Sequence, residues 1–308
     1  MLSIMINYKP IEFKSQGVTL RGRLYLPRIN YNKKHAVIIM AHGFTSTISN
    51  MTADKYAEKF QSNGFAVLLY DHRNLGISDG EPRQEINFWV QSRGYIDAID
   101  YAIMQPEIDK SKIAVWGASM SAREAFLVGT IDERVKSIIN IIPAFGDTIP
   151  SAEEYKAYEF AKETLLADDI LALPHSRTEP QPVVSHDQIN HQSRLTELTA
   201  YRWFLEYGGR FGSNWKNEVS STVIETPDHF HIARFAHQLK APILMIVAKN
   251  DEMQGASPEV TSRVFKSIKQ PKEWVDISGG HFGLLYYPSQ LFDKASTAQI
   301  NFLERYLQ

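Results

Sequence analysis

The sequence predicts an α/β protein in which helices cover both faces of a mostly parallel central sheet. Its 308 residues, 44% of them hydrophobic, are enough for a large core. Short, continuous apolar runs alternate along the chain with helix-like stretches, and such runs are typical of strands buried on both faces. None of the runs approaches the roughly 18 apolar residues of a membrane-spanning helix. Alternation of this kind favours a doubly wound sandwich.

The first two predicted strands differ from those that follow. Residues 11–14 and 19–26 alternate apolar and polar side chains and are separated by Gly17, so they are expected to form an antiparallel edge. Buried strands are predicted at residues 36–41, 66–70, 113–116, 137–142 and 242–248, with a further strand at 273–277. Helices are predicted at residues 53–62, 89–102, 122–128, 258–269 and 290–306.

One long interval breaks this alternation. Residues 145–236 contain no strong buried-strand signal and are far too many for a plain connection. A capping box predicts a helix over 151–167, and a second helix is expected over 187–207 before a pair of glycines. We interpret residues 145–236 as a helical cap, or lid, on a core formed by 1–144 and 237–308. Most of its many aromatic side chains are expected to form its own core, and a few to face the active site.

Composition excludes several classes of function. The 33 basic and 35 acidic residues give a net charge of −2, which argues against binding to nucleic acid or to an anionic membrane. The absence of cysteine excludes disulfides, thiolate metal sites and a cysteine nucleophile. No signal peptide is recognisable at the first residues, so a cytoplasmic protein is expected. The sequence leaves the oligomeric state open, a dimer included.

No cofactor and no metal ion are expected. The sequence has no Gly-x-Gly-x-x-Gly string and no phosphate-binding loop. The alternating histidines of Asp228–His231 are compatible with metal ligation, but no third ligand is identifiable and a surface position is expected for them.

Three glycine-x-serine strings compete for the role of a serine nucleophile. Such a nucleophile sits on a sharp strand-to-helix turn with small residues two positions before and after it. The only literal Gly-x-Ser-x-Gly string, 76–80, follows a loop, and Ser257 has no strand directly before it. Residues 117–121 follow the buried strand 113–116 and lead into a helix. We therefore predict Ser119 as the nucleophile and interpret Ser78 as a decoy.

Chain order then predicts a base and an orienting acid. The order in this architecture is serine, acid, histidine. Of the ten histidines, His281 follows the strand at 273–277 through a glycine-containing loop, where sites of open α/β sheets gather. Asp251 follows the strand at 242–248. The order Ser119, Asp251, His281 therefore holds, with Glu252 as the alternative acid.

The loop after the strand at 36–41 predicts an oxyanion hole. A tight loop at His42–Phe44 can direct a backbone N–H at developing negative charge. The predicted donors are the N–H groups of Phe44 and Met120. His42 is interpreted as holding the shape of this loop, not as a base.

Together these motifs resemble the α/β-hydrolase superfamily over the whole chain. More narrowly, the segments 41–44, 70–83 and 279–282 resemble a branch that holds dienelactone-hydrolase-like and Xaa-Pro dipeptidyl-peptidase-like proteins, including hydrolases and acyl transferases of polyketide gene clusters. The resemblance implies the α/β-hydrolase fold and the triad and oxyanion hole named above. The family commonly has glycine where this chain has Ala122-Arg123, so the packing behind the turn is expected to differ.

Two charged features near the predicted site have structural interpretations. Within residues 71–83 we expect a buried arginine–aspartate network that fixes the loop, with direct substrate contact by His72 or Arg83 as the alternative. Arg123 is expected to face solvent from its helix, and the alternative is that it favours an acidic group on the substrate.

The function predicted from these features is that of a serine hydrolase. It would cleave a carboxylic ester or thioester through an acyl-enzyme on Ser119. The alternatives are an acyltransferase that uses the same acyl-enzyme, a Xaa-Pro-type peptidase, and a non-catalytic ligand-binding hydrolase fold. Xaa-Pro peptidases usually carry additional domains, and haloalkane dehalogenases need a carboxylate in place of Ser119. The expected partner is a small-molecule substrate with a largely apolar body.

Overall fold

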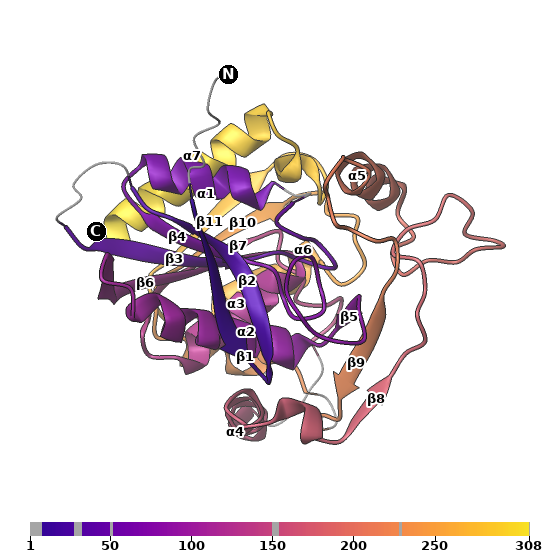
Figure 1. Ribbon diagram of the computed structural model, residues 1–308, viewed down its shortest axis with the longest axis horizontal. Coiled ribbons are helices and arrows are strands. Elements are labelled where there is room, and N and C mark those ends of the chain that lie inside the picture. The colour runs from indigo at the N-terminus through magenta and orange to yellow at the C-terminus, as the bar shows by residue number, and fades with distance from the viewer. Residues whose placement is uncertain (1–7, 28–32, 50–51, 150–153, 228–229, 308) are drawn as a thin grey trace.

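A computed structural model describes residues 8–27, 33–49, 52–149, 154–227 and 230–307. The main strands are β1 Lys9–Ser15, β2 Val18–Tyr25, β3 His35–Ala41, β4 Ala66–Tyr70, β6 Ile108–Ala118, β7 Val135–Ile141, β10 Ile243–Ala248 and β11 Lys272–Ile277. They form one eight-stranded sheet in the order β1-β2-β4-β3-β6-β7-β10-β11 (Figure 1). Strands β4 to β11 of this order pair in parallel, while β1 and β2 form the predicted antiparallel edge.

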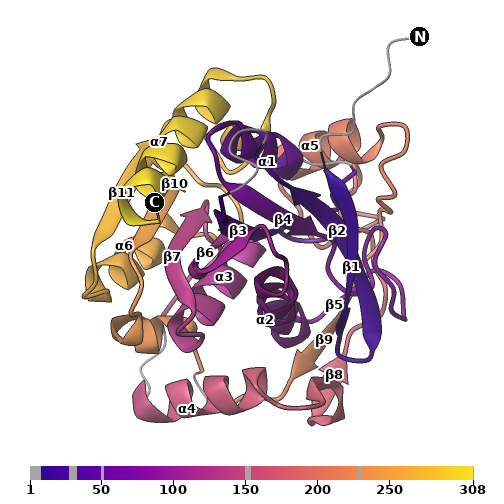
Figure 2. The same cartoon turned by 60° about the vertical axis from the view of Figure 1, so that its left-hand side comes forward.

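Helices cover both faces of this sheet, as predicted (Figure 2). Helices α1 Ala53–Ser62 and α7 Gln290–Tyr306 pack on one face, and α2 Phe88–Ile103, α3 Met120–Ile131 and α6 Pro258–Ser267 pack on the other. Each buried strand contributes alternate side chains to the two cores, which explains its continuous apolar sequence. Every strand and helix predicted outside 145–236 is present.

Helix starts are fixed by the side chains that precede them. The Asn87 side chain accepts hydrogen bonds from the first free N–H groups of α2, and Ser257 does so for α6, where Pro258 occupies the first turn. Ser289 caps α7 in the same way. These caps satisfy backbone groups that would otherwise lack a partner.

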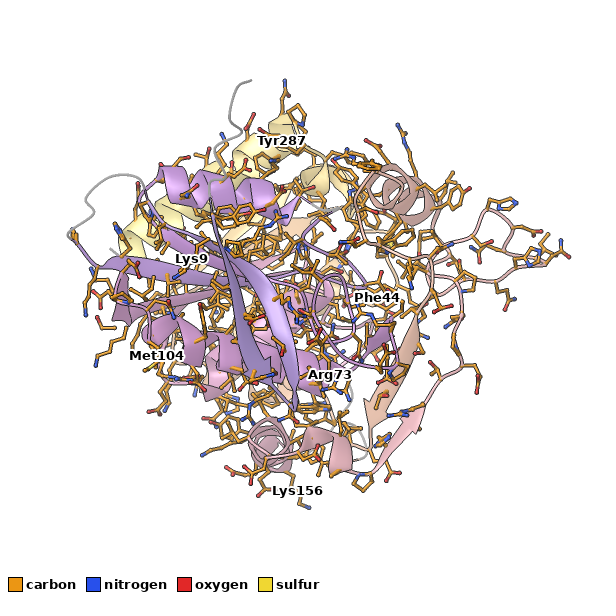
Figure 3. All side chains as sticks on the ribbon, viewed as in Figure 1. Lys9, Phe44, Arg73, Met104, Lys156 and Tyr287 are labelled. Atoms are coloured by element: carbon orange, nitrogen blue, oxygen red, sulfur yellow. The ribbon has the colours of Figure 1, made fainter. Side chains whose placement is uncertain are left out.

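The parallel arrangement brings the loops that carry the predicted site to one edge of the sheet. Residues 44, 119, 251 and 281 follow the carboxyl ends of β3, β6, β10 and β11. Phe44, labelled in Figure 3, lies on this side of the molecule, across the sheet from the exposed Met104. The sheet topology therefore places these chain segments together although they are far apart in sequence.

The segment 145–236 contains strands as well as helices. Its elements are α4 Glu154–Leu165, η1 Ile170–Ala172, β8 His175–Arg177, α5 Leu198–Gly208, β9 Ser220–Ile224 and η2 Ile232–Gln238. Strands β8 and β9 join β5 Glu85–Ile86 in a small three-stranded sheet. These short strands are not predicted from the sequence, because β8 has only three residues and β9 buries Ser220 and Thr222 while it exposes Val223.

The structure contains both helices predicted in this segment, but the second is shorter than predicted. The first matches α4, although Ser151 of its capping box lies outside the described residues. The second was predicted to begin at residue 187, but α5 begins only at Leu198. The reason is a local turn, because Asp187 Oδ1 accepts hydrogen bonds from the N–H groups of Ile189 and Asn190.

The segment is also divided in space. Helix α4 packs with α2 and η2 on the α2/α3 face of the sheet, while α5 lies at the edge where the loops gather. The division of the chain into a core and a cap stays a prediction. Among the described residues, no helix is long and apolar enough to cross a membrane.

Candidate active site

Ser119 occupies a strained turn between β6 and α3. Its φ of 58° lies in the left-handed region that non-glycine residues rarely adopt. The turn is held on both sides, since Ser119 N–H donates to Ile141 O at 3.0 Å and Ser119 O accepts from Ala144 N–H at 3.1 Å. The predicted strand–turn–helix context of Ser119 is therefore present.

Small residues flank this serine for two different reasons. A Cβ atom on Gly117 would lie 2.1 Å from the carbonyl oxygen of Ser121, so only glycine fits there. Ser121 is fully buried, and its hydroxyl contacts both Ala118 N–H at 2.9 Å and Ala41 O at 3.1 Å. The serine at this position thus links the ends of β3 and β6 behind the turn.

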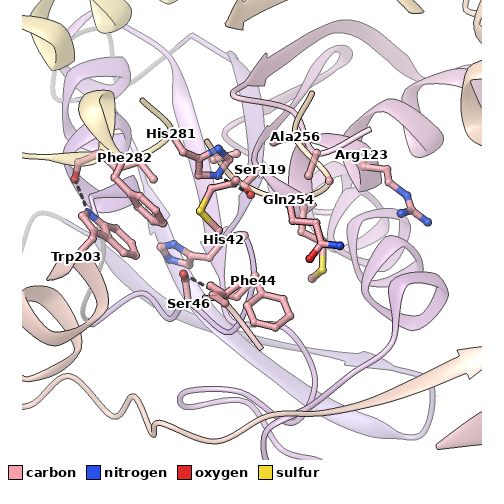
Figure 4. Close-up of a pocket in the computed structure, with 18 of the residues that line it drawn as sticks. His42, Phe44, Ser46, Ser119, Arg123, Trp203, Gln254, Ala256, His281 and Phe282 are labelled. Atoms are coloured by element: carbon pink, nitrogen blue, oxygen red, sulfur yellow. Dashed lines mark hydrogen bonds between the residues drawn. The ribbon is translucent and has the colours of Figure 1, made fainter. Parts of the chain in front are cut away.

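The three residues predicted from chain order lie in hydrogen-bond contact, and Figure 4 shows two of them, Ser119 and His281. His281 Nε2 is 2.9 Å from Ser119 Oγ, and His281 Nδ1 is 2.8 Å from Asp251 Oδ2. The side chains of His281 and Asp251 are 4% and 2% exposed. Contacts this short, with one imidazole nitrogen facing each partner, are what proton transfer to and from a serine hydroxyl requires.

Glu252, the alternative acid, has a different position. Its Oε2 accepts the backbone N–H of His281 at 2.9 Å, and its Oε1 accepts the hydroxyl of Thr199 at 2.5 Å. Burial raises the pKa of Glu252, but these hydrogen bonds outweigh burial and leave the pKa below its usual value. Glu252 therefore holds the loop that carries His281, a role that the sequence does not predict.

The loop after β3 approaches the Ser119 turn closely. A Cβ atom on Gly43 would lie 2.7 Å from Ala118 O and 3.3 Å from Ser119 Cβ, so glycine permits the contact. Phe44 and Met120 both line the cavity in front of Ser119. Within the described residues, neither of their N–H groups has an intramolecular acceptor. Two free N–H groups beside Ser119 are the arrangement expected of an oxyanion hole.

His42 lies next to this loop but differs from His281. It is 3% exposed, and burial lowers its pKa to about 3, with smaller contributions from His72 and Arg23. Such an imidazole stays neutral near pH 7. Its position beside Gly43 agrees with the interpretation that it shapes the loop.

A cavity of about 450 Å³ opens in front of Ser119. Its apolar lining comes from several elements: Phe44, Ile86, Met120, Leu195, Trp203, Phe204, Met253, Phe282 and Leu285. Among the described residues of the segment 145–236, this lining is reached at the start of the segment, by Gly146 and Asp147, and by residues within 194–204. Trp203 and Phe204 of α5 are thus the aromatic side chains of that segment that face the site.

Ser78 has a structural role. Its hydroxyl donates to Asp71 O at 2.5 Å and accepts from Arg21 N–H at 2.9 Å. It is 3% exposed and does not line the cavity in front of Ser119. Its one hydroxyl proton is engaged by Asp71 O and not by an imidazole.

The expected buried arginine–aspartate network in residues 71–83 is present only as one exposed pair, in which Arg21 of β2 donates to Asp79 at 2.5 and 3.1 Å. Backbone groups hold the rest of the loop. Asp71 accepts the N–H groups of Ile48 at 2.7 Å and Ile77 at 3.0 Å. Arg83 donates to backbone carbonyls, Ser78 O at 2.6 Å and Gly76 O at 2.9 Å. Backbone groups satisfy both charges because a turn presents N–H and C=O groups in opposite directions. Arg83 and His72 do not line the cavity in front of Ser119.

Two further predictions concern single side chains. Arg123 is predicted to face solvent, but it is half-buried and lines the cavity, because α3 turns this face toward the loop after β7.

The second prediction concerns the alternating histidines of residues 228–231. His231 caps η2 through Nδ1, and its Nε2 lies 2.5 Å from Phe145 O. Asp228 and His229 lie outside the described residues. The described residues contain no group of three side chains that could hold a metal ion.

Comparison with known sequences identifies related proteins. A family model described as serine aminopeptidase, S33, matches residues 32–282. The polyketide transferase claH of Penicillium crustosum is 34% identical over 98% of this chain and 99% of its own length. The thiohydrolase aneE of Aspergillus aculeatus is 41% identical, over 44% of this chain and 42% of its own length.

Comparison with solved structures gives the same fold. The alpha/beta hydrolase GrgF from Penicillium sp. sh18 superposes with a TM-score of 0.72 and 24% identity, covering 98% of this chain and 99% of that one. The α/β-hydrolase fold implied by the sequence motifs is therefore confirmed.

Proposed function

The chain belongs to the serine aminopeptidase S33 family of α/β hydrolases, and on that basis we propose that it is a serine hydrolase that cleaves a carboxylic ester or thioester. The observation that carries the proposal is the contact series from Ser119 Oγ through the His281 imidazole to Asp251, at 2.9 and 2.8 Å. The thiohydrolase name of aneE supports a thioester as one substrate class.

In the proposed mechanism, Ser119 Oγ attacks the acyl carbon while its proton passes to His281 Nε2. Asp251 accepts the Nδ1–H of His281 and so keeps Nε2 free to take the proton. His281 then gives this proton to the leaving alcohol or thiol, and the acyl group remains on Ser119. A water molecule attacks the acyl-enzyme, loses a proton to His281 and releases the acid, after which the proton returns to Ser119.

The N–H groups of Phe44 and Met120 are proposed to stabilise the oxyanion in both steps. Each such donor typically lowers the barrier by about 3 to 4 kcal/mol. The aromatic and aliphatic lining favours a substrate with a largely apolar body. We propose that residues 145–236 act as a cap through residues 194–204, which close part of this lining.

Acyl transfer is the second candidate function. The polyketide transferase claH is similar to nearly the whole chain, which favours a reaction in which an alcohol or amine takes the acyl group from Ser119. The two functions share every step up to the acyl-enzyme. They differ in whether water or the acceptor reaches the acyl carbon first.

Fluorophosphonate labelling followed by intact mass and peptide mapping tests the shared step. We expect a single adduct on Ser119 that disappears in Ser119→Ala and persists in Ser78→Ala. A well-folded wild type without an adduct would contradict the proposal and favour a binding protein. Reaction of a 4-nitrophenyl hexanoate ester and a hexanoyl thioester, with and without an added alcohol, then separates hydrolysis from transfer by the ratio of acid to new ester.

A further inference from the structure

The cavity in front of Ser119 has two chemically different ends (Figure 4). Trp203 and Phe282 lie at one end, and the guanidinium of Arg123 lies at the other, beyond Gln254 and Ala256. Ser119 and His281 lie between them. A substrate whose scissile carbonyl reaches Ser119 therefore extends toward an aromatic wall on one side and toward a cation on the other.

Arg123 has no acidic partner among the described residues. No carboxylate oxygen there lies within 4 Å of it, and its side chain makes no hydrogen bond. Asp147 also lines this end, but its Oδ1 accepts the N–H of Gly255 at 2.9 Å. Glu124, the next residue of α3, faces the other way, with Oε2 3.2 Å from His72 Nε2. The donors of Arg123 are therefore available to a ligand.

The guanidinium is also held in place. Its Cζ lies 4.1 Å from the centroid of the Phe88 ring, at the start of α2. Stacking on an aromatic ring fixes the plane of the guanidinium and leaves its edge free to bind two oxygens in parallel. This orientation lowers the entropic cost of binding because the side chain is already ordered.

Burial without a counter-charge is unfavourable for this side chain. Burial lowers the pKa of Arg123, and only Glu124 acts in the opposite direction. A methionine or leucine would pack on Phe88 without that cost. A half-buried guanidinium that lines the cavity without an acidic partner is therefore a candidate contact for a ligand anion.

We propose that Arg123 binds a carboxylate of the substrate, so that the preferred esters or thioesters carry an acid group remote from the scissile carbonyl. This inference rests on the proposed function. A carboxylate matches one planar guanidinium through two parallel N–H···O bonds. Because Ser119 lies between the two ends, the carboxylate belongs either to the acyl group or to the leaving group.

Four ester probes distinguish these two sources. The mono-4-nitrophenyl ester of adipic acid carries the carboxylate on the acyl group, and the matching terminal amide is neutral. The hexanoate ester of 4-hydroxyphenylacetic acid carries it on the leaving group, again beside its neutral amide. The measured quantity is the ratio of kcat/KM for acid over amide within each pair, in wild type, Arg123→Gln, Arg123→Lys and the control Arg263→Gln on the exposed face of α6.

We expect wild type to prefer the acid by about tenfold or more in one of the two pairs, the usual effect of one charged hydrogen-bonded contact. Arg123→Gln should bring that ratio close to one, Arg123→Lys should retain part of it, and Arg263→Gln should leave it at the wild-type value. Thermal melting followed by circular dichroism verifies that each variant is folded. If Arg123→Gln does not fold, a ratio in Arg123→Lys equal to that of wild type contradicts the inference.

Other outcomes separate the two proposals. A wild type that cleaves the ester bond of the neutral probes equally well, with no preference for the acid probe in either pair, overturns the role of Arg123. The hydrolase function then remains intact. An acid preference that persists in Arg123→Gln overturns the role of Arg123 as well. A wild type that hydrolyses none of the four probes and takes no fluorophosphonate overturns the proposed function, and with it this inference.

Discussion

Two turns that share the Gly-x-Ser pattern behave differently in this protein. Gly76–Gly80 matches the Gly-x-Ser-x-Gly string literally, and Gly117–Ser121 departs from it at the last position. The first turn lies in a loop, where Ser78 Oγ is held by Asp71 O and Arg21 N–H. The second joins β6 to α3, and its serine hydroxyl lies 2.9 Å from His281 Nε2.

The glycines of the two turns also serve different purposes. A Cβ atom on Gly76 would lie 2.0 Å from the Asp71 carboxylate, so this glycine makes room for a buried acid. A Cβ atom on Gly117 would meet the backbone of the first turn of α3. The chemistry of a serine motif therefore depends on what its hydroxyl contacts, which the strand before it and the helix after it decide.

The largest expected difference between the turns is in catalysis. Ser119→Ala should lower kcat/KM for an ester substrate by roughly 10⁵- to 10⁶-fold, because no other hydroxyl can take the acyl group. Steady-state hydrolysis of 4-nitrophenyl hexanoate measures this loss, with thermal melting as the test of folding. Activity close to that of wild type would place the nucleophile elsewhere.

The hydrogen-bond series beyond Ser119 is the next feature that separates the turns. Asp251→Asn should lower kcat by about 10⁴-fold, because an amide favours the wrong imidazole tautomer. Glu252→Gln is the matched control, and its loss should be much smaller because an amide oxygen still accepts the N–H of His281. A greater loss in Glu252→Gln than in Asp251→Asn would show that the acid is Glu252.

The loop after β3 lies close to the Ser119 turn, which is a third difference between the Ser119 and Ser78 turns. Gly43→Ala should lower kcat by about 10²-fold or more, because its Cβ would lie 2.7 Å from Ala118 O and push Phe44 N–H away from Ser119. The comparison of kcat with the rate of fluorophosphonate labelling measures the effect on the reacting serine. Wild-type values of both would mean that this loop does not stabilise the oxyanion.

Ser78→Ala should have the smallest effect on activity and a visible effect on stability. We expect kcat/KM within about twofold of wild type, because Ser78 does not line the cavity. The free energy of unfolding should fall by about 1 to 3 kcal/mol, since the buried carbonyl of Asp71 loses its donor and the part-buried N–H of Arg21 loses its acceptor. Urea denaturation measures the second quantity. A large loss of activity with unchanged stability would reverse the roles of the two serines.

Much of the fold could be predicted because its signals are local. A buried parallel strand needs a continuous apolar run, so β3, β4, β6, β7 and β10 are visible in the sequence. The strand-to-helix context distinguishes Ser119 from Ser78, and the positions of Asp251 and His281 follow from the strands before them. The short strands β8 and β9 and the late start of α5 lack such signals, because polar side chains and one Asx turn decide them.

The sequence by itself determined which strands carry the candidate site and in what order, because hydrophobic periodicity and parallel pairing together place the ends of those strands at one edge. Only the tertiary structure distinguishes the positions of the neighbours Asp251 and Glu252, since one carboxylate contacts the imidazole of His281 and the other contacts its backbone N–H. It also turned Arg123 toward the cavity instead of solvent. The orientations of these side chains depend on contacts between segments that are distant in the sequence. A residue pattern within one segment does not specify such contacts.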